Sequence, residues 1–148
     1  MICYLDSSAL VKRYFNEPGS AAFRQFLGDA QVIGSASISR AEIVAAFSRS
    51  VRQGLVAHEV AEAARRILQI DWKDVFSMEV SEAVIDRATD LVWRHGLRGY
   101  DSVQLAAAVT WQETLDTPMS FATFDSNLWQ AAAREGLAPY PHERPGIR

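Results

Sequence analysis

The sequence predicts a three-layer α/β domain in which helices cover both faces of a central, mainly parallel sheet. Short apolar segments typical of strands alternate along the chain with longer amphipathic segments typical of helices. The chain has 148 residues, of which 49% are hydrophobic, and a chain of this length can bury a substantial core. The sequence contains no internal repeat and no linker-like stretch, so residues 1–148 are expected to form a single domain.

In the N-terminal half, breaks in the apolar pattern separate each predicted element from the next. A buried strand is expected at 2–6, followed by a helix at 7–16 with apolar residues at helical spacing. After the break at Glu17-Pro18-Gly19, Ser20 is expected to cap a second helix that ends near residue 28. The following predicted elements are a strand at 31–36, a helix at 39–53 ended by Gly54, and a helix at 58–70.

The C-terminal half continues this alternation. The predicted elements are a strand at 74–79, helices at 81–95 and 101–115, a strand at 119–124, a helix at 126–135 and an edge strand at 136–140. Pro139 suits an edge strand, because proline lacks the N–H that an inner strand donates. Residues from about 141 to 148 are Pro-rich and expected to form an irregular tail. Strands separated by helices pair in parallel, which gives the predicted sheet.

Composition restricts the class of protein. No apolar run approaches the roughly 20 residues that cross a membrane, and the N-terminus lacks a signal-type segment. A cytoplasmic protein with no membrane partner is therefore expected. The formal net charge of −3 argues only weakly against a nucleic-acid partner. The chain has 18 acidic residues against 15 Lys and Arg. If the acids at predicted helix starts bind a metal, 14 acidic residues remain and the net charge no longer argues either way. These acids are Asp6, Glu42, Asp101 and Asp125.

Helix capping is one explanation for these four acids. Asp6 and Asp125 each follow a predicted strand, and Asp is a favoured N-cap residue. Ser39-x-x-Glu42 has the pattern of a capping box, and Asp101-x-x-Gln104 resembles one. Acids near a helix N-terminus also gain typically about 0.3–1 kcal/mol from the helix dipole. For any single acid, capping is the simpler explanation.

The predicted topology provides a second explanation for the same acids. In an open parallel sheet, the strand-to-helix junctions lie at the carboxyl edge, where ligands bind. Several carboxylates in one crevice repel each other, and without a cation some of them bind protons because their pKa values rise. Mg²⁺ or Mn²⁺ relieves that repulsion, since hard cations prefer carboxylate oxygens. The pattern permits a metal site but does not by itself distinguish it from capping.

The acids lie in four segments that follow one another in a fixed order: YLDSSALVKRYF, SRAEIVAAF, LRGYDSVQLAAA and ATFDSNLWQAA. In order, spacing and chain length, these segments resemble the PIN-domain family, and in particular the VapC-type ribonuclease toxins of toxin–antitoxin pairs. The resemblance covers nearly the whole chain and implies a single PIN-like nuclease domain. It matches Asp6, Glu42 and Asp101 to the three acids that hold a divalent metal, and Asp125 to a fourth acid that is less uniform in the family.

The resemblance also suggests roles for neighbouring residues. Thr123 matches a hydroxyl position whose hydrogen bond orients a carboxylate or water, and Ser7 is expected to cap a helix or support the ligands. Many relatives have a further acid where this chain has Asn127, so the occupancy of a second metal is left open. Four basic residues lie near the predicted mouth of the site in sequence, where phosphate binding and ordinary surface charge are equally good explanations: Lys12, Arg13, Arg40 and Arg98.

The resemblance implies a Mg²⁺-dependent endoribonuclease, with Mn²⁺ as a substitute ion, that hydrolyses RNA with a metal-activated water, and the residues are compatible with this chemistry. The resemblance implies that it is the toxin of a toxin–antitoxin pair, with a cognate antitoxin as partner, and that it forms a homodimer. Trp93, on an otherwise polar helix segment, is the best candidate for an interface. An antitoxin groove is expected along the first helix, which carries Leu10, Val11, Tyr14 and Phe15.

Three alternatives remain open at this point. The first is an RNA-processing nuclease of the same fold without an antitoxin. The second is a phosphotransfer α/β module with Asp6 as the acceptor, although it lacks the second acid two residues after Asp6 and any glycine-rich phosphate loop. The third is a non-catalytic module in which the acids only cap helices.

Overall fold

A single parallel sheet forms the centre of the computed structural model, which describes residues 1–146. The strand order is β3-β2-β1-β4-β5, and every neighbouring pair is parallel. The predicted parallel α/β fold is therefore confirmed, and Pro139 lies in an edge strand as expected. The strands are β1 (Ile2–Leu5), β2 (Val32–Ala36), β3 (Phe76–Met78), β4 (Ser120–Ala122) and β5 (Ala138–Tyr140).

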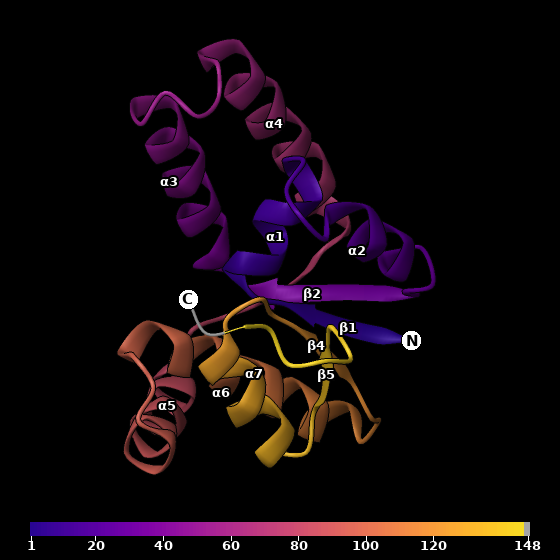
Figure 1. Ribbon diagram of the computed structural model, residues 1–148. Helices are drawn as coiled ribbons and strands as arrows, with labels where there is room; N and C mark the ends of the chain where they lie inside the picture. Colours follow the sequence, from indigo (N-terminus) through magenta and orange to yellow (C-terminus); the bar gives the residue numbers. More distant parts are fainter. Residues whose placement is uncertain (147–148) are drawn as a thin grey trace.

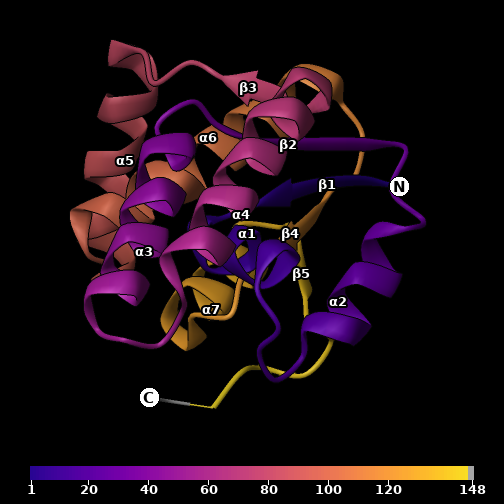
Figure 2. The ribbon, with the colours of Figure 1, turned by 90° about the horizontal axis from the view of Figure 1, so that it is seen from above.

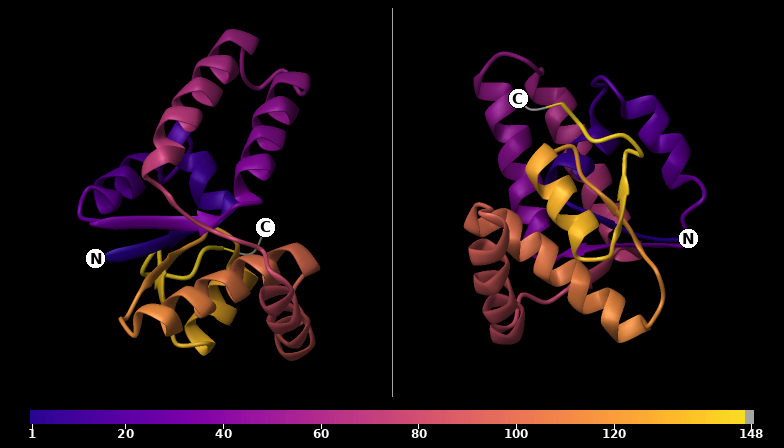
Figure 3. Two further views of the ribbon diagram at one scale, coloured as in Figure 1. Left: turned by 180° about the vertical axis from the view of Figure 1, so that it is seen from behind. Right: turned by 60° about the horizontal axis from the view of Figure 1, so that its bottom comes forward.

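Helices cover both faces of this sheet, which gives the predicted three layers (Figures 1 and 2). One face carries α1 (Ser7–Tyr14), α2 (Ser20–Leu27), α3 (Ser39–Arg52) and α4 (His58–Asp71). The other face carries α5 (Glu82–His95), α6 (Gly99–Leu115) and α7 (Ser126–Arg134). The hairpin formed by α3 and α4 projects away from the sheet (Figure 3). Within residues 1–146, no helix has the length and apolar character that a membrane span requires.

The sheet separates two hydrophobic cores, and the side chains of β1 alternate between them. Tyr4 packs in the core formed with α5, α6 and α7, whereas Cys3 and Leu5 pack in the core formed with α1 to α4. In β2, a Cβ atom on Gly34 would lie 2.3 Å from the ring of Trp111. Glycine at this position therefore allows Trp111 of α6 to pack directly against the sheet.

Several predicted elements have different bounds in the structure. The helix expected at 7–16 ends at Tyr14, and the strands expected at 119–124 and 136–140 cover only Ser120–Ala122 and Ala138–Tyr140. The segment 74–79 is strand only at Phe76–Met78, because a 3₁₀ turn at Trp72–Asp74 continues α4 and buries Trp72. The helix expected at 101–115 begins two residues earlier, at Gly99. Residues 141–146 contain no helix or strand, as predicted for the tail, and its last two residues lie outside the described part.

The predicted cap of α2 is wrong. Gly19, not Ser20, occupies the N-cap position, and its φ of 88° lies in the left-handed region that favours glycine. The Ser20 hydroxyl is buried and donates to the carbonyl oxygen of Phe15 at 2.9 Å. Ser20 thus fixes the preceding turn and does not cap the helix.

Candidate active site

Two of the four acids follow adjacent strands and reach the same edge of the sheet. Asp6 follows β1, Asp125 lies three residues after β4, and these strands pair in parallel. Asp6 Oδ1 accepts the N–H of Ala9 at 2.9 Å, and Asp125 Oδ1 accepts the N–H of Leu128 at 2.8 Å. Both residues are therefore N-caps, as the sequence predicted. Each cap uses Oδ1 and leaves Oδ2 to face other partners.

The other two acids lie in the first turns of their helices but do not cap them. Neither α3, which carries Glu42, nor α6, which carries Asp101, has a side-chain hydrogen bond at its cap. The predicted capping box is wrong because Ser39 is fully buried and its hydroxyl accepts the side-chain amide of Gln104 at 2.8 Å. The same amide donates to Glu42 Oε1 at 2.8 Å. Gln104 belongs to this network and is not a capping residue.

One cavity of about 270 Å³ brings all four acids together. Helices α1, α3 and α6 and the start of α7 supply its walls, which places it at the carboxyl edge of the sheet. The topology argument thus predicted the acids that share a cavity. The lining residues are Asp6, Ser7, Ser8, Val11, Glu42, Ala46, Arg49, Arg98, Asp101, Gln104 and Asp125.

Asp6 is the most enclosed of the acids, with 4% of its surface exposed. Its Oδ2 accepts the hydroxyl of Thr123 at 2.6 Å, and its Oδ1 accepts the hydroxyl of Ser8 at 2.7 Å. Burial raises the pKa of Asp6 to about 7, the hydrogen bonds from Thr123, Ala9 and Ser8 oppose that rise, and the charge of Asp101 adds to it. A cation bound next to Asp6 would therefore stabilise its ionised carboxylate and lower its pKa.

The remaining acids also influence one another. Burial raises the pKa values of Glu42 and Asp101, and negative charge adds to both, from Asp101 on Glu42 and from Asp125 on Asp101. Arg98 opposes the rise at Asp101, with its Nε 3.5 Å from Asp101 Oδ2 and its Nη2 3.6 Å from Asp125 Oδ2. The Arg98 side chain is 84% exposed, so water screens these two ion pairs.

The donor set of the cavity fits a hard divalent cation, since its ligating groups are carboxylate oxygens. Within residues 1–146, however, no three acidic, histidine or cysteine side chains are close enough together to hold one ion. Binding therefore requires some of the acids to turn toward each other. Glu42 and Asp101 are only half-buried and have room to turn, whereas hydrogen bonds hold Asp6 and the capping bond to Leu128 holds Asp125.

Of the four basic residues proposed from the sequence to hold phosphate, only Arg98 lines the acid cavity. Lys12 is buried in an adjacent cavity, where its ammonium contacts Glu17 at 3.2 Å and the ring of Phe124 at 4.7 Å. Arg13 pairs with an acid of α4, and Arg40 lies over a ring next to α4. These three residues do not line the acid cavity, and their contact with RNA phosphates stays a prediction.

Asn127 also lies outside the acid cavity. It lines a neighbouring polar cavity with His95, Gln130 and Arg134. Residues two apart on a helix point about 200° away from each other, so Asn127 and Asp125 face different sides of α7. The prediction that Asn127 supports the ligands is therefore not matched by its placement, whereas Ser7 and Thr123 lie beside the acids.

Sequence reasoning missed two residues of the cavity, Arg49 and Gln104. Arg49 lies seven residues after Glu42, a spacing that returns to the same face of a helix. Gln104 stands alone as a polar residue in the apolar segment SVQLAAAV, and a buried amide must find hydrogen-bond partners. Both signals were present in the sequence.

Comparison with known proteins agrees with this fold. Residues 3–134 match the PIN domain family. Ribonuclease VapC49 of Mycobacterium tuberculosis is 29% identical over 145 residues, which cover 95% of each chain. VapC20 of the same organism, named as a sarcin–ricin loop cleaving toxin, shares the fold with a TM-score of 0.65 at 15% identity, over 97% of this chain and 99% of the other. A toxin–antitoxin complex from Klebsiella pneumoniae contains a similar fold, with a TM-score of 0.60 at 12% identity over 84% of this chain and 87% of that one. This chain therefore belongs to the PIN-domain family.

Proposed function

We propose that this protein is a metal-dependent endoribonuclease of the VapC type that acts as the toxin of a toxin–antitoxin pair. The observation that carries the proposal is the cavity in which Asp6, Glu42, Asp101 and Asp125 meet at the carboxyl edge of a PIN-domain sheet. The relatives named as ribonucleases, which match along nearly the whole chain, support the same activity.

The residues of the cavity have distinct roles in this proposal. Mg²⁺ or Mn²⁺ held by the four acids would lower the pKa of a water molecule and would stabilise charge on the phosphate. Asp6 is the fixed ligand, because Thr123, Ser8 and the backbone of α1 orient its carboxylate. Glu42, Asp101 and Asp125 complete the ligand set. Arg98 and Arg49, which line the same cavity, donate to the phosphates that flank the reacting bond.

Mapping of new RNA 5′ ends after induction in a bacterial host tests this proposal. Asp101→Asn is the control, since it removes one ligand charge and keeps the size of the side chain. Discrete new ends with the wild type alone are the expected result, and they would also identify the RNA. Identical end patterns in both strains, together with no Mn²⁺ binding by the purified protein, would refute the proposal.

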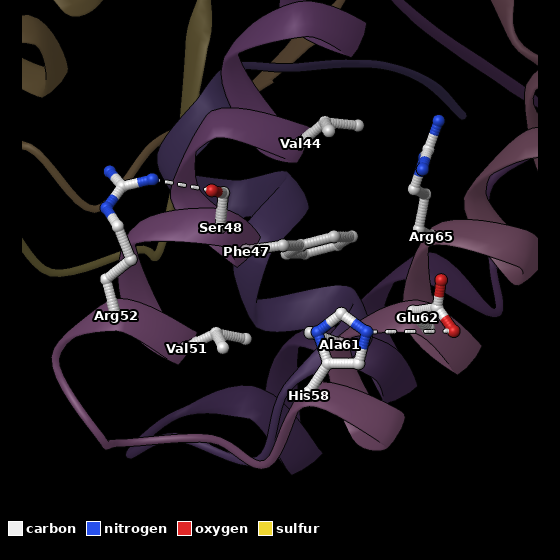
Figure 4. A pocket seen from close by; sticks show the side chains of 9 residues that line it. All are labelled: Val44, Phe47, Ser48, Val51, Arg52, His58, Ala61, Glu62 and Arg65. Atoms are coloured by element: carbon white, nitrogen blue, oxygen red, sulfur yellow. Dashed lines mark hydrogen bonds and ion pairs between the residues drawn. The ribbon is translucent and has the colours of Figure 1, made fainter.

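The antitoxin site proposed here is a groove between α3 and α4, not the face of α1. Leu10 belongs to the core on that face of the sheet, whereas Val11 and Tyr14 are partly buried and pack against it. The groove has a volume of about 320 Å³ and an apolar floor that includes Phe47 and Ala61 (Figure 4). Val44 and Val51 extend that floor along α3, and Arg52, His58, Glu62 and Arg65 lie around it. An amphipathic antitoxin segment with acidic residues at its edges would complement this surface.

Val51→Glu tests the groove, because a charge on its floor opposes burial of an apolar segment. We expect the variant to lose co-purification with the cognate antitoxin while it cleaves RNA as well as the wild type. Leu55→Glu is the matched control, since Leu55 is 74% exposed and does not line the groove. Equal antitoxin binding by wild type and Val51→Glu would refute this site.

The proposed homodimer rests on Trp93. Its side chain is 93% exposed on α5, which is unusual for a residue that gains much from burial. A second copy that covers Trp93 would remove this apolar surface from water, and aromatic residues are enriched at such interfaces.

A further inference from the structure

A buried chain of hydrogen bonds connects the backbone of β2 to Glu42. The N–H of Ala36 donates to Tyr4 Oη at 3.0 Å, and Tyr4 Oη donates to Gln104 Oε1 at 2.6 Å. Gln104 Nε2 then donates to Ser39 Oγ and to Glu42 Oε1, each at 2.8 Å. Tyr4, Ala36, Ser39 and Gln104 are all at most 2% exposed. Water therefore does not compete for the bonds among these four residues.

The order of donors in this chain determines which way the Gln104 amide faces. A backbone N–H can only donate, so the Tyr4 oxygen accepts from Ala36. The single phenol proton is then directed at Gln104, which must present its oxygen to Tyr4. The two N–H bonds of the amide consequently point toward Ser39 and Glu42. The backbone of β2 thus sets the orientation of an amide on α6, and that amide holds a carboxylate on α3.

The surroundings of Gln104 show that an amide is not needed there for packing. Its helical neighbours Leu105, Ala106 and Ala107 are apolar and fully buried. A buried amide loses its hydration, and only hydrogen bonds compensate for that loss. An apolar residue of similar volume would fill the same space without that requirement. The use of glutamine is explained by its contact with Glu42.

We propose that Gln104 is a positioning residue that holds Glu42 in the orientation required for metal binding, and that Tyr4 acts through Gln104. This inference rests on the metal-dependent activity proposed above. Glu42 is half-buried and has three rotatable side-chain bonds, and the Gln104 amide and the Ser7 hydroxyl are its hydrogen-bond partners. Loss of the amide therefore removes one of the two groups that orient its carboxylate. The ring of Tyr4 stacks on Phe121 with a centroid distance of 5.4 Å, which fixes the hydroxyl that faces Gln104.

Gln104→Met tests the proposal directly, because it keeps the length of the side chain and removes the amide. We expect Mn²⁺ affinity, measured by titration calorimetry, to fall about 10- to 100-fold, the usual effect of losing a group that supports a ligand. Excess Mn²⁺ should restore most of the RNA cleavage. The matched control is Gln112→Met, two turns further along the same helix. Its amide bonds the backbone of Met119 and Gly136 and touches none of the acids.

A double-mutant cycle tests whether Tyr4 acts through Gln104. Tyr4→Phe removes the hydroxyl and keeps the stacked ring, so it also provides a test if Gln104→Met fails to fold. The double variant should bind Mn²⁺ as weakly as Gln104→Met alone, because only one path reaches Glu42. If the losses of Mn²⁺ affinity in the two single variants add up in the double variant, Tyr4 does not act through Gln104.

The outcomes separate this inference from the proposed function. Unchanged Mn²⁺ affinity in Gln104→Met, with clear binding by the wild type, would overturn the positioning role and leave the nuclease proposal standing. Equal losses in Gln104→Met and Gln112→Met would overturn it as well, since the effect would then reflect general destabilisation. No Mn²⁺ binding by the wild type would overturn the metal site itself, and the positioning role with it.

Discussion

The raised pKa of Asp6 predicts that the metal-free protein loses stability as pH rises. Asp6 ionises near pH 3.8 in an unfolded chain, whereas burial raises its pKa to about 7 in the folded protein. Between these values the folded protein keeps a proton that the unfolded chain has released. Stability is therefore highest at the acidic end of this range and falls as pH rises through it. From pH 5 to 7, this difference lowers the free energy of unfolding by about 2 kcal/mol.

Urea unfolding in EDTA at pH 5, 6, 7 and 8 measures this effect, with Asp6→Asn as the comparison. Asparagine remains a good N-cap residue and carries no charge, so the variant lacks the contribution of Asp6 to the pH dependence. The pKa values of Glu42 and Asp101 are also raised, so the free energy of unfolding of the variant still falls with pH, but less steeply. If the free energy of unfolding changed equally with pH in the two proteins, Asp6 would already be ionised at pH 5 in the folded state. This result would refute the reasoning.

Three further predictions concern other parts of the molecule. Arg98→Ala should tighten Mn²⁺ binding severalfold, because it removes a cation from the acids, and should raise the KM for RNA; weaker Mn²⁺ binding would contradict this. Gly34→Ala should lower the free energy of unfolding by about 1–3 kcal/mol in urea melts, because the new methyl group meets the ring of Trp111 at 2.3 Å. A variant as stable as the wild type would mean that Trp111 moves without cost. Trp93→Asp should shift the protein from dimer to monomer in light scattering after size exclusion, and an unchanged mass would exclude Trp93 from the interface.

The fold was predictable because its main signals are local. Alternating apolar segments and breaks at Gly and Pro define most elements, and parallel pairing follows from the helices between the strands. The errors occur where a distant contact decides the local structure. Trp72 extends α4 into a predicted strand because the core buries its ring. Gly19 replaces Ser20 as a cap because the serine hydroxyl bonds the turn before it. Neither contact is visible in a sequence pattern.

The acids of the site were predictable for a related reason, and their supporting residues were not. Asp6 and Asp125 follow strands of a parallel sheet, whose strand-to-helix junctions share one edge, so their positions in the sequence were enough to place them. Asp101 opens a helix that follows another helix, and the family resemblance was needed to group it with the others. Gln104 supports Glu42 from 62 residues away and is held by Tyr4 from 100 residues away. That contact depends on how α6 crosses the sheet. Tertiary contacts also explain the placement of Lys12. Its charge suggested a role at the surface, whereas the fold buries it against Glu17.

The four acids of the cavity fall into two groups, a fixed pair whose carboxylates accept backbone N–H bonds and a mobile pair held by side chains alone. Asp6 and Asp125 are tied to helix backbones by their capping bonds, and Asp6 has three donors in all. Within residues 1–146, Asp101 pairs only with the exposed Arg98, and Glu42 is held by the Gln104 amide and the Ser7 hydroxyl. The acids do not yet surround an ion, so the closing movement must come mainly from Asp101 and Glu42. Capping therefore does not compete with metal binding at Asp6, because the bonds that begin the helix also hold the carboxylate toward which the mobile acids close.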